Sequence, residues 1–339
     1  MANQMGEIFL ARQQYFGFKK ETDHGVAVTL SNSEYKYLGE NLKLKINIKE
    51  NQRKYAVGDP YAFVSVMGAQ HAEFSVTVHV QGSGVVNAAP AHWDLLELAC
   101  FTQLTPSGTF YASSLQLPNA TGTFEFEQKE NAASSIRGKK YRLKGAAATK
   151  CTEHYDGAGQ LQKIDFTFMG ALTAVTDLTA GGNAVPVLTA DTGVPPAVLA
   201  ATVVYGGLTL PTNGITVDYG LKGNLVEYPP DPTGYAYTVI SDLDPIVNMK
   251  VLIQLEATLG VYAALTNVGS IEALTMTLGS GTTGTQMIDV MPQAQIVKGL
   301  DIEARDGIDE QPLMFRGIRN TAAVHSFAIP IFGKFMPIA

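Results

Sequence analysis

The stretch that decides the fold is residues 42–81, which read LKLKINIKENQRKYAVGDPYAFVSVMGAQHAEFSVTVHVQ. Over residues 42–49, leucine and isoleucine alternate with lysine and asparagine, which is typical of a strand with one buried face. A polar loop follows at residues 50–58, and two further strand-like runs occupy residues 61–66 and 74–80. The stretch therefore predicts an antiparallel meander that is apolar on one side and polar on the other.

The same order of strands and loops returns late in the chain. A strand begins at residues 215–217, and a proline-rich loop is expected at residues 222–234. The following run, YAYTVI at residues 235–240, matches YAFVSV at residues 61–66. At an offset of about 174 positions, the next apolar positions also correspond: Met249, Val251, Ile253 and Leu255 match Phe74, Val76, Val78 and Val80.

A second, shorter sequence match supports the repeat. YDG at residues 155–157, followed by IDFTFMG at 164–170, resembles RDG at residues 305–307, followed by LMFRG at 313–317. Its offset is about 150 positions, so the second copy would lack some of the intervening residues. We interpret the chain as two copies of one β module.

This interpretation divides the chain into three parts. Residues 1–178 form a first module with an N-terminal arm, residues 179–205 a low-charge linker, and residues 206–339 a second module. At 339 residues, the chain is long enough for each module to bury a core. The expected fold class is mainly β, with two tandem sandwich or barrel modules.

One helix is expected to pack on the first module. It spans Ala91–Gln103, follows Pro90, and places Trp93, Leu96 and Cys100 on one face, which predicts a buried core helix. The second copy lacks this sequence, although residues 261–274 are expected to hold a brief helix in the same place.

Two charged segments are predicted to pair. Residues 123–127 alternate aromatic and acidic side chains, and residues 140–144 alternate basic and apolar ones. On adjacent strands the opposite charges would face each other, which we expect on the solvent side of the sheet.

Composition excludes several functions. The net charge of −7 gives no basic surface for gripping phosphates, and the lysines at 43, 45 and 49 are expected on a solvated strand face. Cys100 and Cys151 are too few for a disulfide framework and are expected to be buried thiols. No secretory signal and no apolar run of the ~20 residues needed to span a bilayer are visible.

No catalytic, cofactor or metal site is predicted. The six histidines are scattered, and CxxC, HExxH and GxSxG are missing. The glycine-rich residues 279–284 lack the Lys-Ser/Thr end of a phosphate-binding loop. The acidic residues 301–310 fail the EF-hand pattern and are expected to form a solvated turn. An enzyme is therefore not expected.

In order along the chain, several motifs resemble the major tail tube proteins of long-tailed bacteriophages. They are GSG at 82–84, PAHWDLLELACF at 90–101, TFEF at 123–126 and FTFMG at 166–170. The resemblance implies a structural virion protein whose sheets join those of its neighbours into a barrel around a channel. Stacked rings of this kind form the tail tube, which conducts the genome. The second copy departs from the pattern, because it lacks the GSG and the tryptophan helix.

The resemblance also implies partners. Family rings carry six tube modules, so three chains would form a ring with pseudo-sixfold symmetry, or six chains if the second module decorates the outside. Rings would stack, and the tube would contact other tail proteins (tape measure, terminator and distal tail) and let DNA pass transiently. The chain would be assembled in the host cytoplasm into the virion tail.

Two loops are predicted to contact the next ring. The first contains Gln52, Arg53, Lys54 and Tyr55, which are too polar for a core. The second, at the corresponding place of the second module, contains Tyr228, Pro229, Pro230 and Asp231.

Other functions remain open at this point. One is a β-sandwich binding module of the carbohydrate-binding or adhesin type, which should show clustered exposed aromatic residues on one sheet face. Another is a tail or baseplate component related to the tube.

Overall fold

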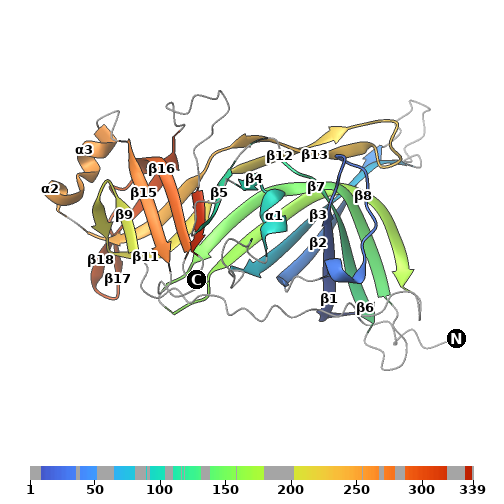
Figure 1. Ribbon diagram of the computed structural model, residues 1–339, viewed down its shortest axis with the longest axis horizontal. Helices are drawn as coiled ribbons and strands as arrows, with labels where there is room; N and C mark the ends of the chain where they lie inside the picture. Colours follow the sequence, from blue (N-terminus) through green and yellow to red (C-terminus); the bar gives the residue numbers. More distant parts are fainter. Residues whose placement is uncertain are drawn as a thin grey trace, which may run out of the picture.

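The computed structural model describes the following residues: 9–35, 39–51, 65–80, 89, 92–103, 110–115, 117, 119–130, 138–157, 159–178, 202–253, 255–266, 271–278, 287–318 and 333–337. The fold is mainly β, as predicted, with large antiparallel sheets and three short helices (Figure 1). The predicted strands of the opening stretch lie in β2 (Gly39–Asn51) and β3 (Val66–His79), which pair directly. Of the second predicted strand, residues 61–66, residues 61–64 lie outside the described residues.

The first half of the chain forms a six-stranded antiparallel sheet in the order β2–β3–β8–β7–β6–β1. The remaining members are β1 (Phe9–Lys20), β6 (Gly122–Glu130), β7 (Gly138–Tyr155) and β8 (Lys163–Leu178). The sheet curls strongly (Figure 1). Among the described residues, however, no backbone pairing joins β1 to β2, so the sheet is not a closed barrel.

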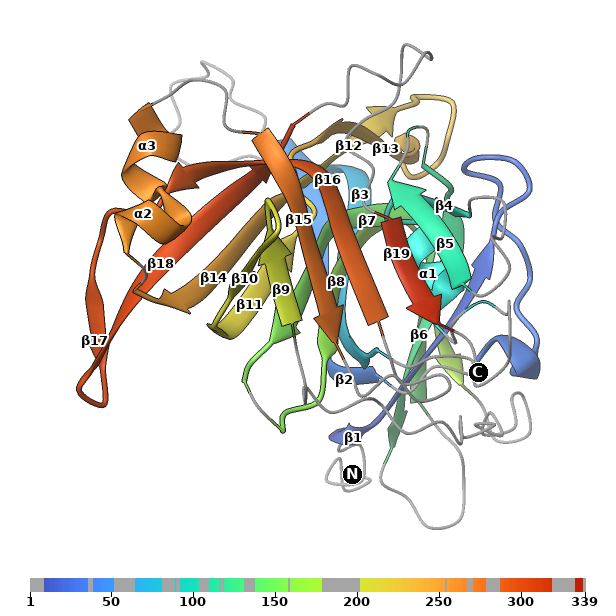
Figure 2. The same cartoon turned by 60° about the vertical axis from the view of Figure 1, so that its left-hand side comes forward.

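The second half forms a sheet in the order β11–β14–β18–β16–β15–β9 (Figure 2). These strands are β9 (Thr202–Tyr205), β11 (Thr212–Asp218), β14 (Ile246–Leu252), β15 (Ile271–Leu278), β16 (Met287–Lys298) and β18 (Ile308–Gly317). In chain order the strands of this sheet occupy the same six places as β1, β2, β3, β6, β7 and β8 occupy in the first. The two halves therefore share one topology, which supports the predicted duplication.

Helices and bulges repeat in the same places. In the first half α1 (Trp93–Glu97) lies between the third and fourth strands, and in the second half α2 (Glu256–Leu259) and α3 (Val261–Thr266) do. The pairing of β2 with β3 shifts register around Asn41 (φ 54°), and that of β11 with β14 shifts around Gly214 (φ 75°). Both residues are in the left-handed region, where a bulge places its extra residue.

The remaining elements decorate or connect the sheets. They are the 3-10 turn Asn32–Glu34, β4 (Phe101–Gln103), β5 (Phe110–Leu115), β10 (Leu208–Leu210), β12 (Leu221–Glu227), β13 (Tyr235–Leu243), β17 (Glu303–Arg305) and β19 (Gly333–Pro337). β12 and β13 form a separate hairpin, and β19 pairs with both β5 and β16. Strand β8 ends at the predicted end of the first module, Leu178, whereas residues 202–205 of the predicted linker form β9. The linker residues 179–201 lie outside the described part of the chain.

The predicted helix Ala91–Gln103 is too long. Helix α1 stops at Glu97, because Cys100 adopts φ 66° and Phe101 then pairs with Leu115 as part of β4. Trp93, Leu96 and Cys100 are nevertheless all buried, as predicted.

Two further predictions need correction. Residues 222–227 of the predicted loop belong to β12, so only residues 228–234 form the turn before β13. Strand β14 ends at Leu252, so Ile253 and Leu255 do not continue it and are exposed. The brief helix expected within 261–274 is present as α3. The acidic segment 301–310 is expected to be a solvated turn: residues 301–309 are exposed, but the turn itself is Asp306–Gly307, between β17 and β18, and Glu310 is buried.

The core of the first sheet is a cluster of phenylalanines. Phe74 of β3 lies 5.3 Å from Phe16 and 5.7 Å from Phe124, and Phe124 lies 4.6 Å from Phe168, between ring centroids. These residues come from four strands of one sheet, so the contacts fix its curvature.

Candidate functional site

The two halves are joined strand to strand. The C-terminal end of β7 extends beyond β6, and β11 pairs with it there: Ile215 with Tyr155, Thr216 with His154, Val217 with Glu153, and Asp218 with Thr152. The joint is buried, with Val217 and Glu153 both 0% exposed. Glu153 accepts a hydrogen bond of 2.7 Å from the Tyr155 hydroxyl, which satisfies part of its buried carboxylate. One sheet edge of the second half is thereby covered by the first.

The β12–β13 hairpin reaches across from the second half and runs along β7 and β8 (Figure 1). The Thr238 hydroxyl donates to the Met169 carbonyl at 2.6 Å, and Asn119 bonds the backbone of Thr238 and of Ile240. Gly145 of β7 adopts φ +58°, and a Cβ there would lie 2.6 Å from Tyr237 Cα. The close approach therefore requires glycine.

The tip of this hairpin holds the second predicted ring-contact loop. Tyr228 is 50% exposed, and Pro229 and Pro230 are exposed beside it. Asp231 is half-buried, bonds the backbone and side chain of Thr233, and forms an ion pair with Lys144 of β7. Although burial raises its pKa, the hydrogen bonds from Lys144 and Thr233 lower the pKa of Asp231 below its usual value. Asp231 thus anchors the tip, and the other three present their side chains outward.

The first predicted loop cannot be compared in the same way. Gln52, Arg53, Lys54 and Tyr55 lie outside the described residues.

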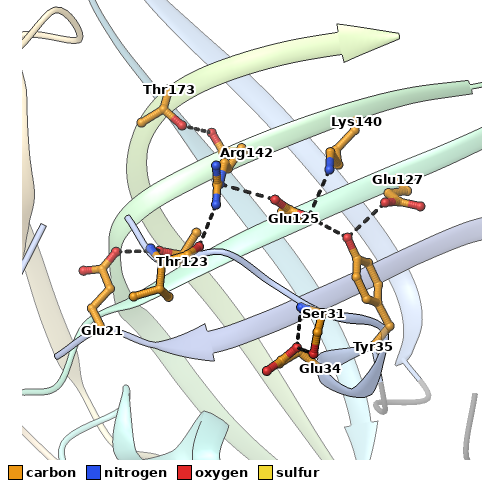
Figure 3. A network of polar contacts seen from close by, with 11 residues as sticks. Glu21, Ser31, Glu34, Tyr35, Thr123, Glu125, Glu127, Lys140, Arg142 and Thr173 are labelled. Carbon is orange, nitrogen blue, oxygen red and sulfur yellow. Dashed lines mark hydrogen bonds and ion pairs between the residues drawn. The ribbon is translucent and has the colours of Figure 1, made fainter. Parts of the chain in front are cut away.

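A buried polar network fastens the N-terminal segment over the first sheet (Figure 3). The Tyr35 hydroxyl lies 2.6 Å from Glu125 Oε2 and 2.9 Å from Glu127 Oε1, and donates its hydrogen bond there. Lys140 and Arg142 each approach Glu125 to 3.3 Å. Burial, and then the hydrogen bond to Glu125, raise the pKa of Tyr35 far above its usual value.

This network corrects one prediction. Glu125 pairs with Arg142 and Glu127 with Lys140 across β6 and β7, as predicted. However, the two glutamates are 5% and 1% exposed, so they do not face solvent. Tyr35 and the segment before it cover them.

Glu21 makes a second anchor for the same segment. Its carboxylate accepts hydrogen bonds from the hydroxyls of Thr121 and Thr123, each at 2.8 Å, and from the backbone nitrogens of Gly25 and Gly145 at 2.9 and 2.8 Å. The donors already satisfy the carboxylate, so the role of Glu21 is to position the chain.

The first sheet ends in an open edge. Among the described residues, β2 pairs only with β3. Apolar residues of its hairpin are incompletely covered: Ile46 is 39%, Ile48 49%, Val66 51% and Met67 65% exposed. Lys43 and Lys45 are exposed on the polar side, as predicted. An edge of this kind is suited to pairing with another chain.

A second open edge lies in the second sheet. Strand β17 pairs only with β18 among the described residues, and the β17–β18 hairpin projects from the body of the molecule (Figure 2). Residues 301–309 are all exposed, including Ile302 at 67%. Four of these nine residues carry a carboxylate: Asp301, Glu303, Asp306 and Asp309.

Neither a metal site nor a membrane-spanning helix is found among the described residues. In the described part of the chain, no group of three or more His, Cys, Asp or Glu side chains is arranged to hold a metal ion. None of the described helices has the length and apolarity to cross a membrane. Neither family models nor curated proteins give a match for this chain.

Sequence reasoning missed the β7–β11 joint and the Tyr35 network. Each brings together residues about 60 to 100 positions apart, and no local spacing signals such contacts. In the sequence, only the repeat pointed to this joint, because the sheet edges of two similar modules can pair with each other.

Proposed function

We propose that this chain is a structural subunit that associates with copies of itself into a ring, and that the rings stack into the tail tube of a long-tailed bacteriophage. The association part of the proposal rests on the shared topology of the two halves and on their joint. The assignment to a phage tail rests on the sequence motifs around the Trp93 helix.

The observation that best supports this proposal is the β7–β11 joint. In it, the edge strand of the second half pairs with the end of a long strand of the first, and we take this pairing as the way in which one module binds another. A chain built from two such modules makes this contact once internally. In the described part of the chain, β1, β2, β10 and β17 each pair on one side only, and the proposal uses two of these free edges, β2 and β17. Head-to-tail contacts that use both free edges generate a closed ring or an open filament.

Ring stacking is assigned to the exposed tip of the β12–β13 hairpin, at Tyr228, Pro229 and Pro230. The hairpin is held on β7 by Asp231 and on β8 by Thr238, so its tip is presented in a fixed position. A fixed, exposed tip is suited to repeated contact with an identical ring. In the proposed tube, three chains per ring give six modules.

The runner-up function is a binding module for carbohydrate or a host surface. It requires exposed aromatic side chains gathered on one sheet face. Among the described residues, the aromatic side chains that are largely exposed are Tyr228 and Tyr262, which lie on the hairpin tip and on α3. They do not form a shared face, which favours the assembly function.

The test is direct imaging of purified protein at high concentration by negative-stain electron microscopy. Rings or tubes with a central channel, and a native mass that is a multiple of three chains, are the expected result. A protein that stays monomeric at millimolar concentration would refute the proposal. Thermal stabilisation by members of a glycan panel would instead support the binding module.

A further inference from the structure

The repeat lets each position of the first module be matched to one in the second through strand pairing. Phe168-Met-Gly170 of β8 corresponds to Phe315-Arg-Gly317 of β18. Leu44 pairs with Phe74, which pairs with Phe168. Val217 pairs with Val247, which pairs with Phe315, so Val247 is the match of Phe74, and not Met249 as predicted from the sequence. Leu44 of β2 therefore takes the place that Val217 takes in β11.

The strand with which β11 pairs, the C-terminal end of β7, is matched to the second half in the same way. His154 at the end of β7 pairs with Lys163, five positions before Phe168. Glu303 of β17 pairs with Glu310, five positions before Phe315. Glu303 therefore takes the place of His154, and Ile302 and Asp301 take the places of Glu153 and Thr152.

We infer that β2 of one chain pairs antiparallel with residues 301–304 of a second copy, in the register of the internal β7–β11 joint. Substituting matched positions into that joint places Lys43 opposite Glu303, Leu44 opposite Ile302, and Lys45 opposite Asp301. This inference rests on the proposed function, and it specifies which residues of two copies meet.

Charge supports this register independently of topology. Lys43 and Lys45 of β2 both fall opposite carboxylates, and the apolar residues Leu44 and Ile302 fall opposite each other. Opposite charges placed directly across two antiparallel strands are stabilising, and like charges are destabilising. The basic strand face and the acidic turn, which have no other evident function, become complementary halves of one contact.

Exposure agrees with this contact. In the internal joint, Thr152 and Glu153 are 4% and 0% exposed, because β11 covers them. The matching residues, Asp301 and Ile302, are exposed, and so are Lys43 and Lys45. The second module thus lacks the cover that the first module receives from β11.

The ion pairs that these residues form within one chain do not prevent them from pairing with a second copy. Lys45 lies 3.3 Å from Glu73, Glu303 lies 2.7 Å from Lys250, and Asp301 lies 3.1 Å from Lys298. At least one side chain of each pair is more than half exposed, and such pairs contribute little to stability. The groups can therefore be re-paired across an interface.

The partner must be a second copy. Figure 1 shows β17 at the left-hand end of the molecule in the second sheet, and β2 in the right-hand half in the first sheet. One chain cannot bring its own two edges together without breaking the β7–β11 joint. Because the contact joins two different surfaces, it is head-to-tail and leaves each added copy with a free edge until a ring closes.

Charge reversal tests this inference. Lys43→Glu with Lys45→Glu, and separately Asp301→Lys with Glu303→Lys, should each weaken association by roughly tenfold or more, because like charges then face each other. All four substitutions in one chain restore both pairs and should restore assembly. The control, Lys139→Glu with Lys222→Glu, makes the same charge change on exposed residues outside the contact and should assemble normally. Association is followed by analytical ultracentrifugation, and folding by circular dichroism.

A covalent trap tests the register. Lys43→Cys with Glu303→Cys should give chain-to-chain disulfides on mild oxidation, whereas Lys43→Cys with Asp242→Cys should not. If the wild-type chain assembles but neither charge reversal weakens association, this contact is wrong and the proposed function stands. The same holds if the variant with all four substitutions does not recover assembly. If the wild-type chain forms no assembly at all, the proposed function fails and the inference fails with it.

Discussion

Replacing Tyr35 with phenylalanine isolates the buried network that holds the N-terminal segment on the first sheet. The substitution keeps the buried ring and removes only the hydroxyl, which lies 2.6 Å from Glu125 and 2.9 Å from Glu127. The hydroxyl has one proton, so it donates fully to only one of the two carboxylates at a time. A hydrogen bond to a charged acceptor contributes about 1.5–3 kcal/mol. We therefore expect the free energy of unfolding to fall by about that amount.

The assay is urea unfolding followed by tryptophan fluorescence, with the free energy taken from the midpoint and slope. Tyr262→Phe, at a tyrosine that is 60% exposed on α3, is the matched control and should change stability by less than about 0.5 kcal/mol. A loss below about 0.5 kcal/mol for Tyr35→Phe would refute the hydrogen-bond assignment.

The same pair of proteins should differ in its response to alkali. Because the folded-state pKa of Tyr35 lies above its unfolded value of about 10, the hydroxyl stabilises the fold fully below that pH. This contribution is lost as the pH rises above about 10, where the unfolded tyrosine ionises and the folded one does not. The stability difference between wild type and Tyr35→Phe should therefore be constant from about pH 7 to 9 and shrink above 10. A difference that grows with pH would contradict the assigned shift.

Three further predictions concern the core and the hairpin. Trp93→Ala should lower stability by about 3–5 kcal/mol, because it empties a buried site beside α1; an unchanged melting temperature would exclude a core role. Gly145→Ala should loosen the β12–β13 hairpin, since the added methyl clashes with the backbone of Tyr237. Hydrogen exchange at Thr238 and Ile240 would then accelerate, and unchanged protection would disprove the close contact. Cys100, whose pKa burial raises to about 12, should resist thiol reagents at pH 8 until the protein unfolds, and rapid labelling would show otherwise.

Local periodicity was enough to predict many strands. The alternation from Leu42 to Ile48 and from Phe74 to Val80 identified β2 and β3, because a half-buried strand exposes every second residue. The complementary charges of residues 123–127 and 140–144 identified a correct pair, because directly opposed residues must tolerate each other.

The failures come from contacts that are distant in sequence. Glu125 and Glu127 look like solvent-facing residues until Tyr35, about 90 positions away, covers them. The end of α1 depends on Cys100 entering the left-handed region, which a non-glycine residue does only when its surroundings require it. Likewise, Lys222–Glu227 is strongly polar for a strand, and only its pairing with β13 makes it one.

Pairing of β11 with β7 also affects how readily larger structures form. Each covalent chain carries two similar units already docked, so every second contact in the proposed ring is unimolecular and independent of protein concentration. A ring of six units would then need only three contacts between separate chains in place of six. Tethering also relieves the two units of the need to remain identical, which leaves one free to keep a tryptophan helix and the other to extend a hairpin over its neighbour.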